Sequence, residues 1–226
     1  MLEIGSLEIQ SRYMARIIPA GDGYYHVYNR GVLKQPIFLE EEDYFKFLHD
    51  LQRFNAIKIG SREIGSRKPL VSILAWCLMP NHFHLFLQQR QEEGVSLFMH
   101  RLGVGFTMFM NKKYKRSGHL FQSKYQAKLI SGDAQFFHIS RYVHLNPLDL
   151  IEPEWEEHGV REPRKAEKFI EEYCWSSYAD WLGNERFPSI IDELAVRDIR
   201  AGTGDYRKFV RDWISRDPIS GADVIG

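Results

Sequence analysis

Two histidines separated by one residue stand out as side chains that could carry chemistry. The run His82-Phe83-His84 opens an apolar segment that continues as Leu85-Phe86-Leu87, which is typical of a strand. Side chains two residues apart on a strand point to the same face, so the two imidazoles would lie side by side and could hold a divalent metal ion. Two half-buried or solvent-facing histidines would produce the same short pattern, so both interpretations stay open.

A tyrosine and an asparagine four residues apart form the second candidate set. Tyr142 and Asn146 precede Pro147, which should end a helix because the residue before a proline is pushed out of the helical region. Residues four apart share a helix face, so the phenol could act as a nucleophile and the amide oxygen as a hard metal ligand. A packing tyrosine and a helix-ending asparagine explain the same residues. His138 shares this face one turn earlier, whereas His144 should point elsewhere.

Charge is distributed unevenly along the chain. The 226 residues carry 30 basic and 30 acidic side chains, yet the stretch 95–132 contains no Asp or Glu. Such a stretch predicts a surface that binds a nucleic-acid backbone, with an ordinary solvated helix face as the alternative. The candidate DNA contacts are Arg30, Lys112, Lys113, Lys115, Arg116, His119 and Lys124, with Tyr114, Phe121 or Tyr125 available for base stacking.

The elements that would position these residues follow the order of a ferredoxin-like fold. Apolar runs predict four strands, at 23–29, 70–77, 83–88 and the end of 119–130. Helical spacing predicts three helices, at 40–54, 95–114 and 133–145. This order suits an α+β fold with a ferredoxin-like antiparallel four-stranded sheet. Helices would cover one face, with the last helix at an edge or across the sheet.

The length accommodates one catalytic domain with additions at its ends. We expect an N-terminal extension at 1–22, a catalytic domain at 23–150 and a C-terminal helical extension at 151–226. Within the last of these, helical patterns occur near 190–199 and 206–214. The polar, glycine-containing segment 57–68 predicts a loop.

Cysteine usage and hydropathy bear on the cellular compartment. Cys77 and Cys174 lie far apart and form no cluster, so neither a disulfide framework nor a cysteine zinc site is expected. No apolar run approaches the roughly 20 residues that a membrane helix needs. We therefore expect a cytoplasmic protein that does not bind membranes.

Several sequence blocks resemble, in order and spacing, the signatures of the single-tyrosine HUH transposases. The three main blocks are Met79-Pro80-Asn81-His82-Phe83-His84, Gly118-His119-Leu120-Phe121-Gln122-Ser123-Lys124-Tyr125 and Arg141-Tyr142-Val143-His144-Leu145-Asn146-Pro147. Flanking blocks at 25–31 and 175–178 are similar too. Together they resemble the REP-associated tyrosine transposases, over roughly residues 24–182.

The resemblance implies a role for each candidate residue. His82 and His84 would bind Mg²⁺ or Mn²⁺, Tyr142 would be the nucleophile, and Asn146 would be the third metal ligand, where some relatives have glutamine. The substrate would be single-stranded or hairpin DNA, cut through a 5′-phosphotyrosine intermediate by a homodimer or a monomer. A phosphotyrosine bond retains the energy of the phosphodiester, which agrees with the lack of an ATP-binding motif in the sequence.

Two other functional classes stay open. The chain could be a sequence-specific DNA-binding regulator of repeated elements that has lost its cleavage activity. It could also be a metal-dependent hydrolase that uses a bound water, with Tyr142 in a packing role.

Overall fold

A four-stranded antiparallel sheet lies at the centre of the chain, of which the computed structural model describes residues 23–55 and 68–216. The strand order across the sheet is β2-β3-β1-β4. The strands are β1 (Tyr24–Arg30), β2 (Val71–Met79), β3 (His82–Gln89) and β4 (Gln126–Leu129). Every pairing is antiparallel, as a ferredoxin-like sheet requires, so the predicted α+β class is confirmed.

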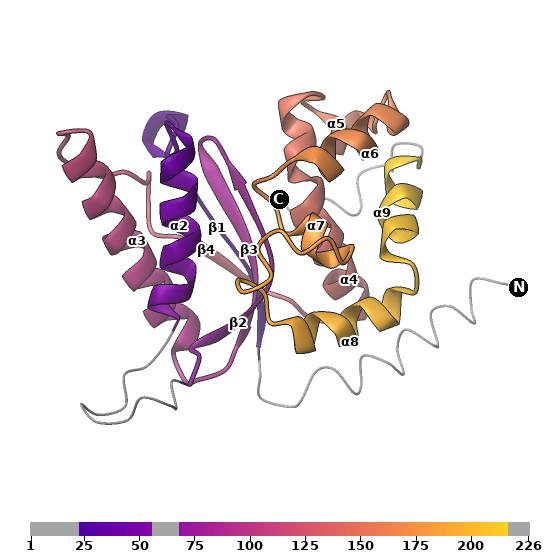
Figure 1. Ribbon diagram of the computed structural model, residues 1–226, viewed down its shortest axis with the longest axis horizontal. Coiled ribbons are helices and arrows are strands. Elements are labelled where there is room, and N and C mark those ends of the chain that lie inside the picture. The colour runs from indigo at the N-terminus through magenta and orange to yellow at the C-terminus, as the bar shows by residue number, and fades with distance from the viewer. Residues whose placement is uncertain (1–22, 56–67, 217–226) are drawn as a thin grey trace, which may run out of the picture.

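Different parts of the chain cover the two faces of the sheet (Figure 1). The helices α2 (Glu41–Phe54) and α3 (Gly94–Lys113) pack together on one face. On the other face, α4 (Asp133–Leu145) lies against β2 and β3. The predicted order of elements is confirmed, and the last of the three predicted helices lies across the sheet.

Alternation along β3 decides which face receives the histidines. Phe83 packs against Phe47 of α2 with ring centroids 5.0 Å apart, whereas Phe86 packs against Phe136 of α4 at 5.1 Å. Since neighbouring side chains on a strand point to opposite faces, His84 lies on the same face as Phe86. The histidine pair and the helix that carries Tyr142 therefore share one face of the sheet.

The C-terminal part of the chain is helical and packs behind α4 (Figure 1). It contains η2 (Asn146–Leu150), α5 (Trp155–His158), α6 (Pro163–Glu172), α7 (Tyr178–Trp181), α8 (Glu193–Thr203) and α9 (Tyr206–Ile214). The two predicted helical patterns correspond to α8 and α9. Helix α8 begins later than predicted because Asp192 caps it, accepting a hydrogen bond from the Ala195 amide at 3.3 Å.

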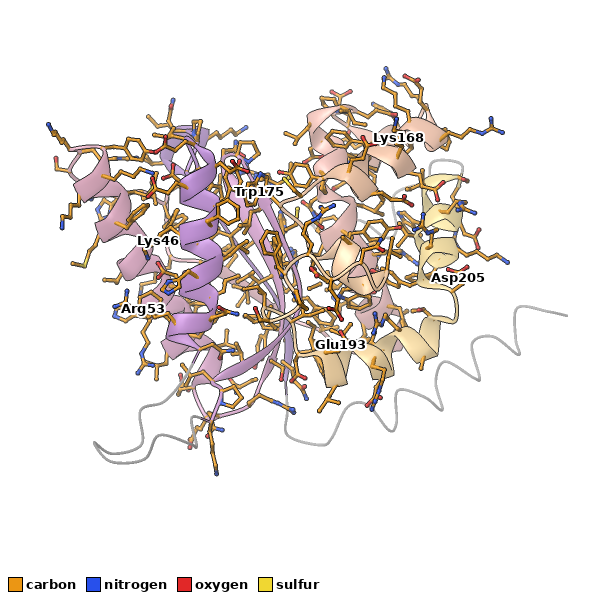
Figure 2. All side chains as sticks on the ribbon, in the orientation of Figure 1. Lys46, Arg53, Lys168, Trp175, Glu193 and Asp205 are labelled. Carbon is orange, nitrogen blue, oxygen red and sulfur yellow. The ribbon has the colours of Figure 1, made fainter. Side chains whose placement is uncertain are left out.

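Residues 175–177 extend the sheet at the edge of β2. The Leu78 amide donates to the Trp175 carbonyl at 2.8 Å, and the Ser177 amide donates to the Trp76 carbonyl at 3.0 Å. The Trp175 ring also stacks on Tyr44 of α2, with centroids 4.4 Å apart (Figure 2). The C-terminal part is therefore hydrogen-bonded to the sheet itself, in addition to packing behind α4.

A buried histidine ties α4 to the C-terminal helices. His144 is fully buried, and its ring nitrogens lie 2.7 Å from the Tyr206 hydroxyl and 2.8 Å from the Ser177 hydroxyl. Burial lowers the pKa of His144 to about 3, so the ring is neutral and can donate with one nitrogen and accept with the other. His144 points away from the face of Tyr142, as predicted.

Some sequence predictions concern other parts of the chain. The expected N-terminal extension and most of the expected loop at 57–68 lie outside the described residues. Within the described ranges, no helix has the length and apolar character needed to cross a membrane. Cys77 is buried, Cys174 is exposed, and both are free thiols.

The start of α2 is held by a buried carboxylate. Asp43 accepts hydrogen bonds from the amides of Leu39 at 2.8 Å and Glu40 at 3.1 Å. The Tyr114 hydroxyl and the Lys113 ammonium, both at the end of α3, donate to it at 2.7 and 2.8 Å. Burial alone would raise the pKa of Asp43, but these hydrogen bonds, chiefly that from Lys113, outweigh burial and hold the pKa below its usual value.

Replacing this carboxylate should destabilise the fold strongly. We expect Asp43→Ala to lower the free energy of unfolding by about 3–5 kcal/mol, because the substitution leaves the amides of Leu39 and Glu40 and the Tyr114 hydroxyl without their acceptor. Urea denaturation at pH 7 measures the change. Because the pKa of Asp43 is depressed in the folded state, its stabilisation is present at neutral pH and is lost as the pH falls through that pKa. The difference in unfolding free energy between the variant and the wild type should therefore decrease in acid. The exposed Glu42 provides the control, since Glu42→Gln should change stability by less than about 1 kcal/mol; equal effects of the two variants would contradict this account.

Candidate active site

An open pocket of about 890 Å³ lies on the face of the sheet that α4 covers. It is lined by the proposed nucleophile Tyr142 and by all three predicted metal ligands, His82, His84 and Asn146. Arg30, one of the predicted DNA contacts, lines it too. Residues from β1, β3, α4 and the start of η2 thus meet in one cavity, although they lie more than a hundred positions apart in the chain.

Each of the two predicted histidine ligands is held by a hydrogen bond at its own Nδ1 atom. His82 Nδ1 lies 2.6 Å from the Asn81 side-chain oxygen, and His84 Nδ1 lies 2.8 Å from His26 Nε2. Their ring centroids are 5.0 Å apart. Because both bonds use Nδ1, Nε2 is the nitrogen that each ring would offer to a metal ion.

Burial keeps these rings neutral. It lowers the pKa of His82 to about 4, with a further contribution from the charge of Arg30. The pKa of the fully buried His84 is lowered well below its usual value, again mainly by burial. A neutral imidazole has the free lone pair that metal coordination requires, so both rings are in the form that can bind a metal.

His26 is one of the residues of this site that were not predicted from the sequence. It is buried on β1, and its ring lies parallel to that of His84 at 5.1 Å, with an interplanar angle of 13°. Burial lowers its pKa to about 3. The available signal was its place on the predicted first strand, inside the block 25–31, but its contact with His84 depends on the pairing of β1 with β3. His26 is placed to orient the His84 ring as an outer-shell partner.

Asn146 has a fixed orientation at the end of α4. Its side chain is buried, and its Nδ2 donates to the Tyr142 carbonyl at 2.8 Å, which leaves Oδ1 as the atom that a cation would contact. In the part of the chain that the structure describes, no three His, Cys, Asp or Glu side chains are arranged to hold a metal ion. The donor set here is instead two imidazole nitrogens and one amide oxygen, which suits Mn²⁺ or Mg²⁺ with water or phosphate oxygens completing the shell.

Tyr142 lies directly over the histidines. Its ring centroid is 5.5 Å from that of His26 and 5.7 Å from that of His84, both in edge-on contact. The Glu156 carboxylate of α5 lines the same pocket. Burial raises the pKa of Tyr142 well above its usual range, and the charge of Glu156 raises it further. The phenol is therefore protonated before any substrate binds, and Glu156 is the carboxylate beside it.

Four carboxylates beside this pocket were not predicted as site residues. They are Asp149, Glu154, Glu156 and Glu157. Burial raises the pKa of Glu156, and the charge of Asp149 raises it further. The sequence pattern of Glu154, Glu156 and Glu157 indicated only acid-rich turns, because their place beside this pocket depends on how the chain folds back after α4.

The predicted DNA contacts fall in three places. Arg30 lines the pocket that contains Tyr142, whereas His119 and Lys124 line a neighbouring groove. Four further residues lie at and just beyond the end of α3 and line neither cavity, namely Lys112, Lys113, Lys115 and Arg116. The structure does not bring all the predicted contacts together in one site.

Lys113 has acidic partners that its own stretch of sequence lacks. Its ammonium lies 2.5 Å from Glu40, 2.8 Å from Glu42 and 2.8 Å from Asp43, all around the start of α2. The stretch itself contains no acidic residue, but Lys113 is paired with acids from another part of the chain. The acids come from a helix about 70 residues earlier, which no local pattern reveals.

Comparisons with known proteins bear on the identity of the chain. The model of a family described as IS200-like transposases matches residues 52–146, which include His82, His84, Tyr142 and Asn146. A solved structure of a REP-associated tyrosine transposase bound to a REP hairpin is similar to this chain, with 13% sequence identity and a TM-score of 0.48. The match covers 74% of this chain and 83% of that one. A search of curated proteins found no match.

Proposed function

We propose, from the match of residues 52–146 to the model of the IS200-like transposases, that this chain cleaves and rejoins single-stranded DNA through a covalent link to Tyr142. The observation that carries the proposal is the meeting of Tyr142 with the paired histidines in one pocket, with the Tyr142 and His84 rings 5.7 Å apart. The resemblance of the sequence blocks to REP-associated tyrosine transposases favours hairpin DNA with a single-stranded flank as the substrate.

The residues of the pocket divide the chemistry between them. The Tyr142 oxygen attacks the phosphorus atom, the bond from phosphorus to the 3′-oxygen breaks, and the products are a 5′-phosphotyrosine and a free 3′-hydroxyl. Glu156 lines the same pocket as the phenol and its charge acts on that group, so it is placed to accept the proton. Arg30 and Lys34 line the same pocket and supply positive charge for the phosphate.

A divalent cation fits the remaining donors. Held by His82, His84 and Asn146, it would supply further positive charge at the non-bridging oxygens. Rejoining is the reverse reaction, in which a different 3′-hydroxyl attacks the phosphotyrosine. No nucleotide cofactor is needed for either step.

A covalent adduct tests the proposal. Hairpin oligonucleotides copied from repeated palindromes of the source genome, with single-stranded flanks, are incubated with the protein and Mg²⁺ or Mn²⁺. A label on the 3′ side of the cut should stay with the protein on a denaturing gel, whereas a label on the 5′ side should be released. Cleavage without an adduct would instead support a hydrolase that uses water. Tight binding without cleavage in either metal would support a DNA-binding regulator.

The basic end of α3 gives a separate prediction about DNA affinity. Replacing Lys112, Lys115 and Arg116 by alanine should weaken single-strand binding and flatten its dependence on salt. Each lost phosphate contact removes about 0.7 from the slope of log affinity against log salt concentration. Fluorescence anisotropy of a labelled oligonucleotide at several salt concentrations measures the slope.

A matched control is available in the same segment. Lys113→Gln should leave the salt slope unchanged, because the Lys113 charge is already balanced by Glu40, Glu42 and Asp43. An unchanged slope in the triple variant would mean that this end of α3 does not contact DNA. The strand would then pass over Arg30, His119 and Lys124.

A further inference from the structure

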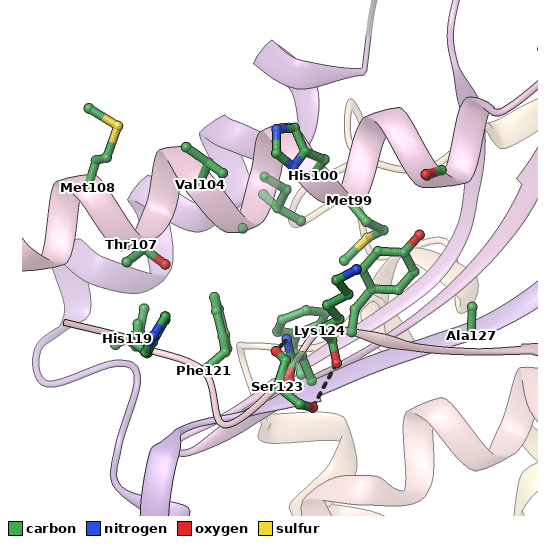
Figure 3. A pocket seen from close by; sticks show the side chains of 17 residues that line it. Met99, His100, Val104, Thr107, Met108, His119, Phe121, Ser123, Lys124 and Ala127 are labelled. Atoms are coloured by element: carbon green, nitrogen blue, oxygen red, sulfur yellow. Dashed lines mark hydrogen bonds between the residues drawn. The ribbon is translucent and has the colours of Figure 1, made fainter.

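A second cavity lies on the other side of β1 from the catalytic pocket. It is a groove of about 670 Å³ between α3 and the segment 119–127 (Figure 3). Met99, Val104 and Met108 of α3 form one wall, and the rings of Phe121 and Tyr125 belong to the other. Its volume falls within the roughly 300–1,000 Å³ of typical ligand sites.

The groove and the catalytic pocket share a wall. Asn29 and Ser123 line both cavities, and the Asn29 amide donates to the Ser123 carbonyl at 3.2 Å. Along the segment 119–127, Gln122 and Gln126 line the catalytic pocket, whereas Phe121 and Tyr125 line the groove. This segment and the end of β1 therefore lie between the two cavities.

The shared wall is firmly held. The Gln122 amide donates to the Arg30 carbonyl at 3.0 Å, and the Val32 amide donates to the Leu120 carbonyl at 3.0 Å. The Phe121 ring meets Phe83 of β3 edge-on, with centroids 5.9 Å apart. The groove is therefore a preformed feature at the end of β1, next to the arginine that lines the catalytic pocket.

The chemistry of the groove favours a nucleic-acid base over other apolar ligands. No Asp or Glu is among the described residues that line it, whereas the catalytic pocket has four. Lys124 and His119 lie at its rim, and Figure 3 shows both side chains on the strand side of the groove. Aromatic rings combined with nearby cations are how proteins hold unpaired bases by stacking while binding the backbone.

We propose that this groove takes an unpaired base of the DNA strand next to the phosphate that is cut. The inference rests on the proposed function, since it places that phosphate in the catalytic pocket. The strand would cross the shared wall at Asn29 and Ser123, and the base would stack on Tyr125 and Phe121. Lys124 would contact the adjoining phosphate.

A fluorescent base tests this placement. In the cleaved hairpin, 2-aminopurine replaces one flanking base at a time, and each oligonucleotide is bound to Tyr142→Phe protein so that no cleavage occurs. We expect quenching, which reports stacking on a ring, at one or two positions next to the cut and at no distant position. Quenching should be lost in a variant that also carries Tyr125→Leu, which keeps the apolar bulk without the aromatic ring. Should no hairpin be cleaved, a random-sequence single strand with 2-aminopurine replaces it, so the test does not depend on the adduct.

Gly103 allows the groove to be filled without disturbing the fold. It lines the groove within α3, and a Cβ atom built there meets no other atom within 4 Å. Gly103→Phe should weaken binding of the flanked hairpin about tenfold, the effect of losing one stacked base, and abolish the quenching. Gly103→Ala, the matched control, leaves the groove open and should bind DNA as the wild type does.

Three outcomes would overturn the proposal. The first is adduct formation at Tyr142 with no quenched position beside the cut. The second is equal affinity and equal quenching for Gly103→Phe and Gly103→Ala. The third is a change of oligomeric state in Gly103→Phe, measured by light scattering, with unchanged DNA binding, which would make the groove a contact between two copies of the chain. The first outcome leaves the proposed function intact, so the two proposals fail separately.

Discussion

Replacing Tyr142 by phenylalanine is expected to abolish the covalent adduct and reduce DNA cleavage by on the order of 10⁴-fold or more, because no other group can take the place of a missing nucleophile. The substitution removes only the hydroxyl and keeps the ring, which contacts His26, His84 and His138. The pocket should keep its shape, and hairpin affinity should change little. A denaturing gel measures the adduct, and fluorescence anisotropy measures binding on the same samples.

Tyr28 provides a matched control for this experiment. It lines the same pocket and stacks on His84 at 5.7 Å, so it is another phenol close to the proposed metal site. Tyr28→Phe should form the adduct at nearly the wild-type rate. If Tyr142→Phe formed the adduct while Tyr28→Phe did not, the nucleophile would be Tyr28 and the proposed role of Tyr142 would be wrong.

Removing either histidine of the pair should have the second largest effect. His82→Ala and His84→Ala are each expected to reduce cleavage by on the order of 100-fold or more, since the positive charge at the phosphate depends on both imidazoles. EDTA should have the same effect on the wild type, with recovery after excess Mg²⁺ or Mn²⁺. The histidine variants should not recover. Asn146→Ala should lose less, because water can replace one oxygen ligand of an octahedral ion.

Metal affinity gives a readout of this site that does not depend on cleavage. Calorimetric titration of Mn²⁺ into the DNA-free protein should show one site in the wild type and weaker binding in both histidine variants. His49→Ala is the control, since His49 is exposed on α2, which packs on the opposite face of the sheet. Undiminished wild-type cleavage in EDTA would rule out a metal-dependent reaction.

The parts of the site that follow from local patterns were predictable from the sequence. Alternation places His82 and His84 on one face of a strand, and a four-residue spacing places Tyr142 and Asn146 near each other at the end of a helix. The order of strands and helices gave the sheet that brings the two pairs together. The resemblance of the sequence blocks to a known family suggested which chemistry to propose, because spacing alone left it open.

Contacts between distant segments were not predictable in the same way. His26 contacts His84 because β1 pairs with β3 in the sheet. The pattern of residues within one strand does not indicate which strand it pairs with. Glu156 reaches Tyr142 through the turn after α4. Lys113 meets acids on α2, a helix that precedes it by about 70 residues. Each of these contacts is tertiary, and the helix that carries Glu156 was itself not predicted.

The packing behind α4 determines when, during synthesis, this helix gains all of its contacts. A chain emerges from the ribosome beginning with its N-terminus, and its segments fold in that order. His144 is hydrogen-bonded to Ser177, which is synthesised 33 residues later, and to Tyr206, which is synthesised 62 residues later. Until both have emerged, the inner side of the helix that carries Tyr142 lacks its final partners. A nascent chain therefore completes the packing of this helix only after residue 206 has been made.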